Sequence, residues 1–79
     1  MIIDIHTHIA NRATFPSMLA EDRRNGVVLN VVSCLGLRGW PSSPTAEVVR
    51  EANELSREFA ASAPGHVLWF CYLNPQLPN

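Results

Sequence analysis

Apolar residues gather in three short runs along the chain, at positions 1–5, 27–33 and 67–73. Each run is nearly continuous and rich in β-branched or aromatic side chains, which is typical of strands buried on both faces of a parallel sheet. The second run is also too short to make a good helix. The pattern therefore predicts three strands separated by two longer segments.

The segment between the first two runs predicts a short helix. Thr14 can cap its start, and Pro16 falls in the first turn, where a missing N–H costs little. Asn25 and Gly26 end it, because glycine readily takes the left-handed conformation found after helices. We expect its buried side to carry Phe15, Met18 and Leu19, and its solvent side to carry Glu21, Asp22, Arg23 and Arg24.

The segment between the second and third runs predicts a longer helix. Ser43 is a natural cap, with Pro44 at the first helical position, and the Pro-Gly pair at 64–65 closes the helix. Arg50 and Glu54 are spaced to pair on its surface. Its apolar stripe recurs at helical spacing and consists of Val48, Ala52, Leu55 and Phe59.

Strand, helix, strand, helix, strand is the order typical of an α/β fold with a parallel sheet and right-handed crossovers. At 79 residues the chain makes one domain at most. An open parallel sheet of three strands leaves two unpaired edges and an uncovered face. We therefore expect residues 1–79 to be the truncated N-terminal part of a larger domain.

Composition and charge narrow the class of protein. The chain is 47% hydrophobic and 16% charged, which indicates a globular protein and not a disordered one. A net charge of -1 and scattered arginines predict no nucleic-acid or anionic-lipid partner. Asp4 interrupts the first apolar run, which argues against a signal peptide, and no run reaches the roughly 20 residues that span a bilayer. We expect a soluble, cytoplasmic protein.

The strongest candidate chemistry lies in the stretch DIHTHI, where His6 and His8 are separated by Thr7 at the end of the first run. Alternate side chains of a strand point the same way, with backbone positions about 6.6 Å apart, so both imidazoles can converge on one ion. Ligand sites collect at the carboxyl ends of strands in parallel α/β folds. Neutral imidazole is a good ligand for zinc and similar divalent ions. The pattern predicts a pair of metal ligands.

The other histidine and the cysteines do not extend this candidate site. A catalytic zinc usually keeps at least three protein ligands, so further ligands must come from elsewhere. His66 opens the third run, at the wrong end of the sheet, and is interpreted as a surface or strand-start residue. Cys34 and Cys71 match no metal-binding spacing and are interpreted as small buried hydrophobes on strands. In the long loop after the second run, Arg38 and Trp40 either touch substrate or simply pack and face solvent.

Asp4, His6 and His8 resemble the Asp-x-His-x-His pattern that ends the first strand in the amidohydrolase superfamily of metal-dependent hydrolases. Within that superfamily the chain is most similar to the amidohydrolase-related group that includes the aminocarboxymuconate-semialdehyde decarboxylase type. The similarity covers essentially the whole chain. It extends to three further features, namely DRRNGV at 22–27, Asn53 in the second helix and YLNPQ at 72–76.

The resemblance implies a fold and a function. The strands would be the first three of the eight in a TIM barrel. His6 and His8 would bind a divalent metal, usually zinc, that takes part in hydrolysis or non-oxidative decarboxylation of a small organic acid. Asp4 would carry no ligand role and would serve orientation or packing. The remaining ligands of the family lie on later strands, so this chain alone is expected to be inactive, and no residue is assigned a catalytic role.

Three alternatives stay open. TatD-like nucleases also begin with such a strand, although Asn53 and the NP after the third run fit them less well. PHP-type phosphoesterases usually continue with Ser-Asp-Gly, whereas this chain has Ile9, Ala10 and Asn11. The third alternative is a truncated, non-catalytic chain that self-associates or docks on a missing C-terminal part.

Overall fold

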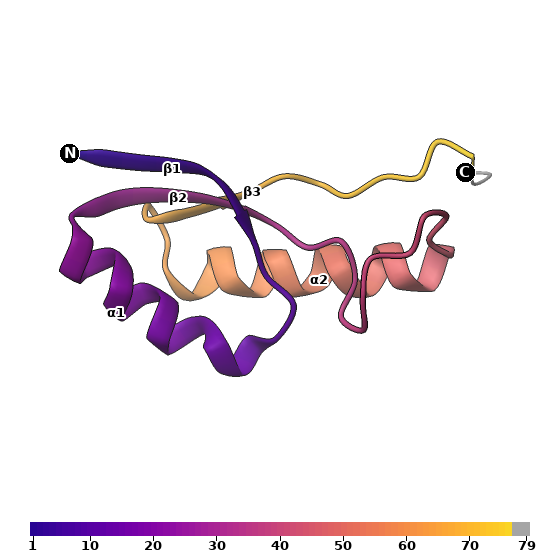
Figure 1. The fold of residues 1–79 in the computed structure, drawn as a ribbon, viewed down its shortest axis with the longest axis horizontal. Helices are drawn as coiled ribbons and strands as arrows, with labels where there is room; N and C mark the ends of the chain where they lie inside the picture. Colours follow the sequence, from indigo (N-terminus) through magenta and orange to yellow (C-terminus); the bar gives the residue numbers. More distant parts are fainter. Residues whose placement is uncertain (77–79) are drawn as a thin grey trace.

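The structure, a computed structural model, describes residues 1–76. Its elements follow the predicted order and form a three-stranded parallel sheet in the order β1-β2-β3 (Figure 1). The bounds are β1 Ile2–His8, the 3-10 turn η1 Arg12–Thr14, α1 Phe15–Asn25, β2 Val27–Ser33, α2 Ala46–Ser62 and β3 Val67–Trp69. The α/β class and the parallel sheet are therefore confirmed.

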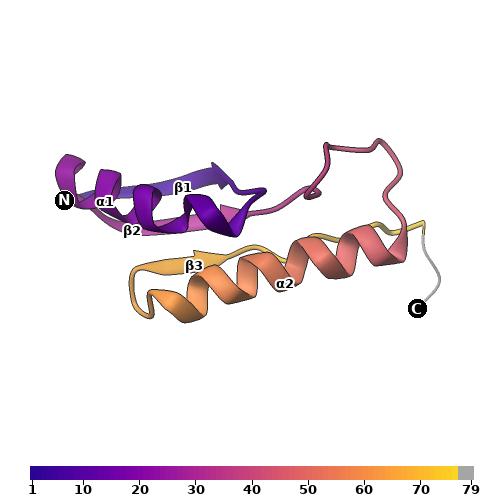
Figure 2. The same ribbon diagram turned by 90° about the horizontal axis from the view of Figure 1, so that it is seen from below.

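Both helices cover the same face of the sheet (Figure 1, Figure 2). The hydrophobic core lies between that face and the helices, where the rings of Phe15 in α1 and Phe59 in α2 stack with centroids 4.2 Å apart. The other buried members of the core are Ile9, Val32, Cys34, Ala52, Leu55 and Val67. Within residues 1–76 no element covers the opposite face, which we call the open face.

Helix α1 begins and ends where the sequence predicts. Thr14 precedes it, but its hydroxyl donates to the Asn11 carbonyl at 2.7 Å and does not cap an N–H of the helix. Gly26 follows it at φ 72°, the left-handed conformation that glycine adopts without strain. The predicted buried side packs on the core through Phe15, Met18 and Leu19.

Helix α2 begins later than predicted. Its cap is Thr45 and not Ser43, and the Thr45 hydroxyl oxygen accepts an N–H of the first turn at 3.2 Å. Serine and threonine are both good cap residues, so local preference alone did not separate them. The predicted pairing of Arg50 with Glu54 is wrong, because Glu54 binds Arg57 instead. In the described part of the chain, no helix is long and apolar enough to cross a membrane.

Strand β3 is shorter than the predicted run 67–73. Three of its residues pair with β2, and the Phe70 N–H donates to the Val32 carbonyl at 2.9 Å. Beyond that point the chain is bound to α2, because the Asn53 amide donates to the Tyr72 carbonyl at 2.9 Å and its oxygen accepts the Tyr72 N–H at 2.6 Å. A side-chain amide thus takes the place of a neighbouring strand.

A polar cluster joins α1, β2 and the start of β3. The Asp22 carboxylate accepts the side-chain amide of Asn30 at 3.1 Å and lies 2.8 Å from His66 Nε2. His66 Nδ1 lies 3.1 Å from the Val28 carbonyl oxygen. The prediction that Asp22 faces solvent is wrong, because these partners allow it to be buried. His66 stands at the start of β3 as expected, but it is partly buried and holds elements together.

The two cysteines occupy different environments. Cys34 is buried in the core, as predicted, although it follows β2 and is not part of the strand. Burial raises the pKa of the Cys34 thiol above its ordinary value, because the thiolate would lose its hydration. Cys71 is exposed, so its predicted burial is wrong. The reason is that the chain has already left the sheet at this position.

Candidate metal site

Strand β1 contains a register shift immediately before the second histidine. Asp4 pairs with Asn30 of β2, whereas Thr7 pairs with Val32, so three steps along β1 match two along β2. One extra residue is therefore accommodated in β1, as in a β-bulge. Within this segment the Asp4 Oδ1 atom accepts the His6 N–H at 3.0 Å. Asp4 thus orients the backbone that carries the first histidine.

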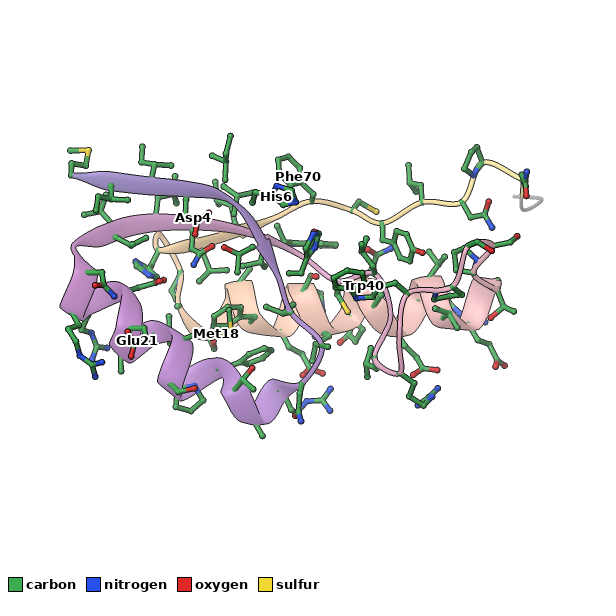
Figure 3. All side chains as sticks on the ribbon, in the orientation of Figure 1. Asp4, His6, Met18, Glu21, Trp40 and Phe70 are labelled. Carbon is green, nitrogen blue, oxygen red and sulfur yellow. The ribbon has the colours of Figure 1, made fainter. Side chains whose placement is uncertain are left out.

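The register shift decides which face the histidines occupy. Strict alternation would place His6 and His8 on the same side as Asp4, toward the helices. Because of the extra residue, Thr7 returns to the helix side and lines the same hollow as Asp4. The two imidazoles consequently emerge on the open face. Figure 3 shows His6 on that side of the sheet together with Phe70, while Asp4 lies on the side of the helices.

The imidazoles of His6 and His8 approach each other closely, as the sequence predicts. Their Nε2 atoms are 3.1 Å apart. Two nitrogens that bind one tetrahedral zinc at about 2.0–2.1 Å lie roughly 3.3 Å apart, so the pair has the spacing of two ligands of one ion. His8 Nδ1 lies 3.0 Å from Ser33 Oγ. This contact with the end of β2 can fix the ring with Nε2 free to bind.

A complete metal site needs donors beyond this pair. Within residues 1–76 no three His, Cys, Asp or Glu side chains are grouped so that they could hold an ion. Asp4 lies on the other side of the sheet, and His66 is bound to Asp22 at the amino end of β3. Residues 1–76 therefore supply two imidazole ligands. Because a tetrahedral ion takes four ligands, up to two more must come from elsewhere.

The loop after β2 brings one of its two candidate residues to the histidines. The Trp40 ring lies against His8, with ring centroids 5.3 Å apart. The Arg38 guanidinium lies 3.3 Å from the Glu51 carboxylate of α2, and both line a pocket of about 360 Å³ with Trp40. This loop depends on Gly36, because a Cβ there would collide with a backbone oxygen. Trp40 is thus part of the site, and Arg38 is held by α2.

Two features of the site were missed in the sequence. Ser33 is the polar last residue of the second apolar run, and His6 and His8 likewise follow the first run, so a signal for Ser33 was present. The register shift left no comparable signal, because it depends on how β1 and β2 align.

The chain was compared with models of protein families, with curated proteins and with solved structures, and none of them matched. The resemblance to the amidohydrolase superfamily therefore stays a prediction from the residues themselves.

Proposed function

We propose that this chain supplies the two-histidine half of a divalent metal site, with zinc as the preferred ion, in an enzyme of the amidohydrolase type. The reaction proposed is hydrolysis or non-oxidative decarboxylation of a small organic acid. The observation that carries the proposal is the 3.1 Å separation of His6 Nε2 and His8 Nε2 on the open face. A divalent ion held there would supply Lewis-acid chemistry and a nucleophile at neutral pH.

The position of the pair in the sheet supports this proposal. His8 is the last residue of β1 and Ser33 is the last residue of β2, so the site lies at the carboxyl ends of parallel strands. In α/β folds and barrels this is where ligand and catalytic sites collect. A pair of imidazoles placed at random on the surface would have no such preference.

The distribution of helices and apolar side chains supports an origin in a barrel. Both helices lie on one face of the parallel sheet, as in the outer ring of a TIM barrel (Figure 2). Exposed apolar residues of β1 and β3 lie on the other face, and the inner face of a barrel is filled by such side chains. The first three strands of a barrel remain our proposal for the larger fold.

We propose a separate role for each residue of such a site. His6 and His8 donate to the metal, Ser33 fixes the His8 ring, and Asp4 fixes the backbone at His6. Trp40 restricts the space beside His8 and offers an apolar surface to a substrate. Proton transfer and substrate selection would depend on residues that this chain does not supply within residues 1–76.

A second candidate is a non-catalytic chain that self-associates or docks on further protein through its sheet. The specific observation in its favour is that Ile5 and Phe70 are 67% and 58% exposed. Apolar side chains of this size are normally covered in a parallel sheet. The two candidates are compatible, since a docked chain can also bind a metal.

Zinc binding by the full chain tests the proposed function. Isothermal titration at neutral pH is expected to detect zinc binding by the wild type and none by His6→Ala/His8→Ala. Ser33→Ala should weaken binding about 10-fold, because losing a partner that orients a metal-binding histidine costs 10–100-fold. His66→Gln is the matched control, since this histidine lies outside the site. Equal zinc binding by wild type and the double variant would contradict the proposal.

A further inference from the structure

We propose that two copies of this chain pair through the open face and that His6 and His8 of each copy together form one four-histidine zinc site. The inference rests on the proposed metal binding and concerns this chain by itself. Four histidines close the coordination sphere of zinc, so the shared site would join two copies and would not itself perform the proposed reaction. It joins two observations that otherwise stand apart, a half-filled ligand set and an uncovered apolar face. Both lie on the same side of the sheet (Figure 3).

The apolar part of the open face is built from β1 and β3. Ile3 and Ile5 flank Asp4, and Leu68 lies between two residues of β3 that pack on the core, so alternation directs these side chains away from the helices. Figure 3 shows Phe70 on the same side. All four side chains are more than half exposed. Several large apolar side chains left uncovered on one face are typical of a surface that another protein covers.

The charge of this face favours a second copy as its occupant. The only ionised side chain in the three strands is that of Asp4, which lies on the helix side. Two open faces brought together would therefore bury no like-charged pair, which would otherwise oppose pairing. A twofold axis also presents the same patch to both partners, so an apolar patch is automatically matched by an apolar patch.

The size of the patch predicts that pairing depends on metal. A half-exposed apolar side chain of this size has an accessible surface on the order of 100 Å². Four of them would bury about half of the ≈ 800 Å² that each partner buries in a stable interface. The apolar contact is thus too small to hold a dimer firmly by itself. A shared zinc would add the missing free energy.

The ligand geometry suits a twofold arrangement. The two Nε2 atoms of one chain are 3.1 Å apart, which is close to one edge of a zinc tetrahedron. A twofold axis through the midpoint of the site supplies the opposite edge from the second copy. Facing sheets pack about 10 Å apart, so each imidazole must reach about 5 Å from its own sheet, which is within the length of a histidine side chain.

Sedimentation of the full chain with and without zinc, combined with zinc quantification, tests this inference. We expect a monomer of 8.8 kDa in the presence of a chelator and a dimer with one zinc per two chains after zinc addition. Zinc should tighten pairing on the order of 100-fold. His6→Ala/His8→Ala should stay monomeric with zinc, and so should Phe70→Asp, which leaves the ligands in place. Circular dichroism checks that each variant is folded, and His8→Gln, which keeps a polar group opposite Ser33, replaces the double variant if that one unfolds.

The possible outcomes separate this inference from the proposed function. One zinc bound per monomer with no change in mass would overturn the dimer and leave the two-histidine site standing. A dimer that forms equally well without zinc, or in the double histidine variant, would also overturn the shared site. No zinc binding under any condition would overturn both.

Discussion

Both faces of the sheet carry apolar side chains, but the two faces lie in different environments. On the helix side, Val32 is fully buried and packs in the same core as Phe59, whereas on the open face Ile5 and Phe70 are more than half exposed. Burial of apolar surface is the main favourable term in folding, so the helix side supplies most of the stability. This difference is the reason why we propose that the open face is covered by further protein.

Each face also carries one polar cluster that contains histidine. On the helix side His66 is matched by a carboxylate, that of Asp22, which lies 2.8 Å from its Nε2 atom. On the open face His6 and His8 have no carboxylate partner in residues 1–76, and their Nε2 atoms face each other. The Asp22 cluster joins three elements through buried contacts, whereas the two Nε2 atoms are exposed and contact each other, so an ion can replace that contact.

The largest difference in the free energy of unfolding is expected between alanine substitutions of one phenylalanine on each face. Phe59→Ala removes a fully buried ring that stacks on Phe15, and we expect it to cost about 3–5 kcal/mol, enough to unfold much of a domain of this size. Phe70→Ala on the open face should change the free energy of unfolding by about 0.5 kcal/mol or less. Urea denaturation of the chelator-treated chain measures both.

The reverse order of these two effects would contradict the assigned roles of the two faces. If Phe70→Ala destabilised the chain as much as Phe59→Ala under conditions where it is monomeric, the open face would be part of the folding core. Measuring at several protein concentrations separates folding of one chain from association.

A smaller contrast is expected between the two polar clusters. Asp22→Ala leaves the Asn30 amide and His66 without their partner, and such a loss costs about 1–3 kcal/mol. His6→Ala/His8→Ala should leave the stability of the metal-free chain nearly unchanged, because both side chains are exposed. Zinc should raise the thermal stability of the Asp22→Ala variant, which keeps both ligands, and should not change that of the double histidine variant. Thermal melts with and without zinc measure this.

The smallest effect on stability is expected at a solvent-exposed ion pair on the surface of α2. A hydrogen bond from Arg57 lowers the pKa of the Glu54 carboxyl, so this pair contributes stability above the ordinary pKa of glutamate and loses it as pH falls through the lowered value. Glu54→Gln should therefore show a slightly smaller loss of Tm than wild type between neutral pH and about pH 3. Water screens this exposed pair, so the difference should be far below that of Asp22→Ala. The double variant Glu54→Gln/Arg57→Gln is the control, and an acid dependence that matches wild type there would assign the effect to other carboxylates.

Local patterns predicted the elements where the chain interacts mainly with its neighbours in sequence. The apolar run 27–33 is strand β2, and the Asn25-Gly26 pair does end α1. These predictions held because side-chain branching and the left-handed glycine act within a few residues. The prediction for Asp22 failed because it depended on a partner far along the chain, namely His66, whose contact allows Asp22 to be buried.

The candidate site shows the same division. Two imidazoles follow an apolar run with one residue between them, and this local pattern is enough to predict a pair of ligands. The face that they occupy depends on the folded sheet, because β1 has one extra residue between Asp4 and Thr7 relative to β2. Side chains of a strand point alternately to the two faces of the sheet, so a single inserted residue moves the pair to the opposite face. That choice depends on the alignment of two strands whose residues are distant in the chain.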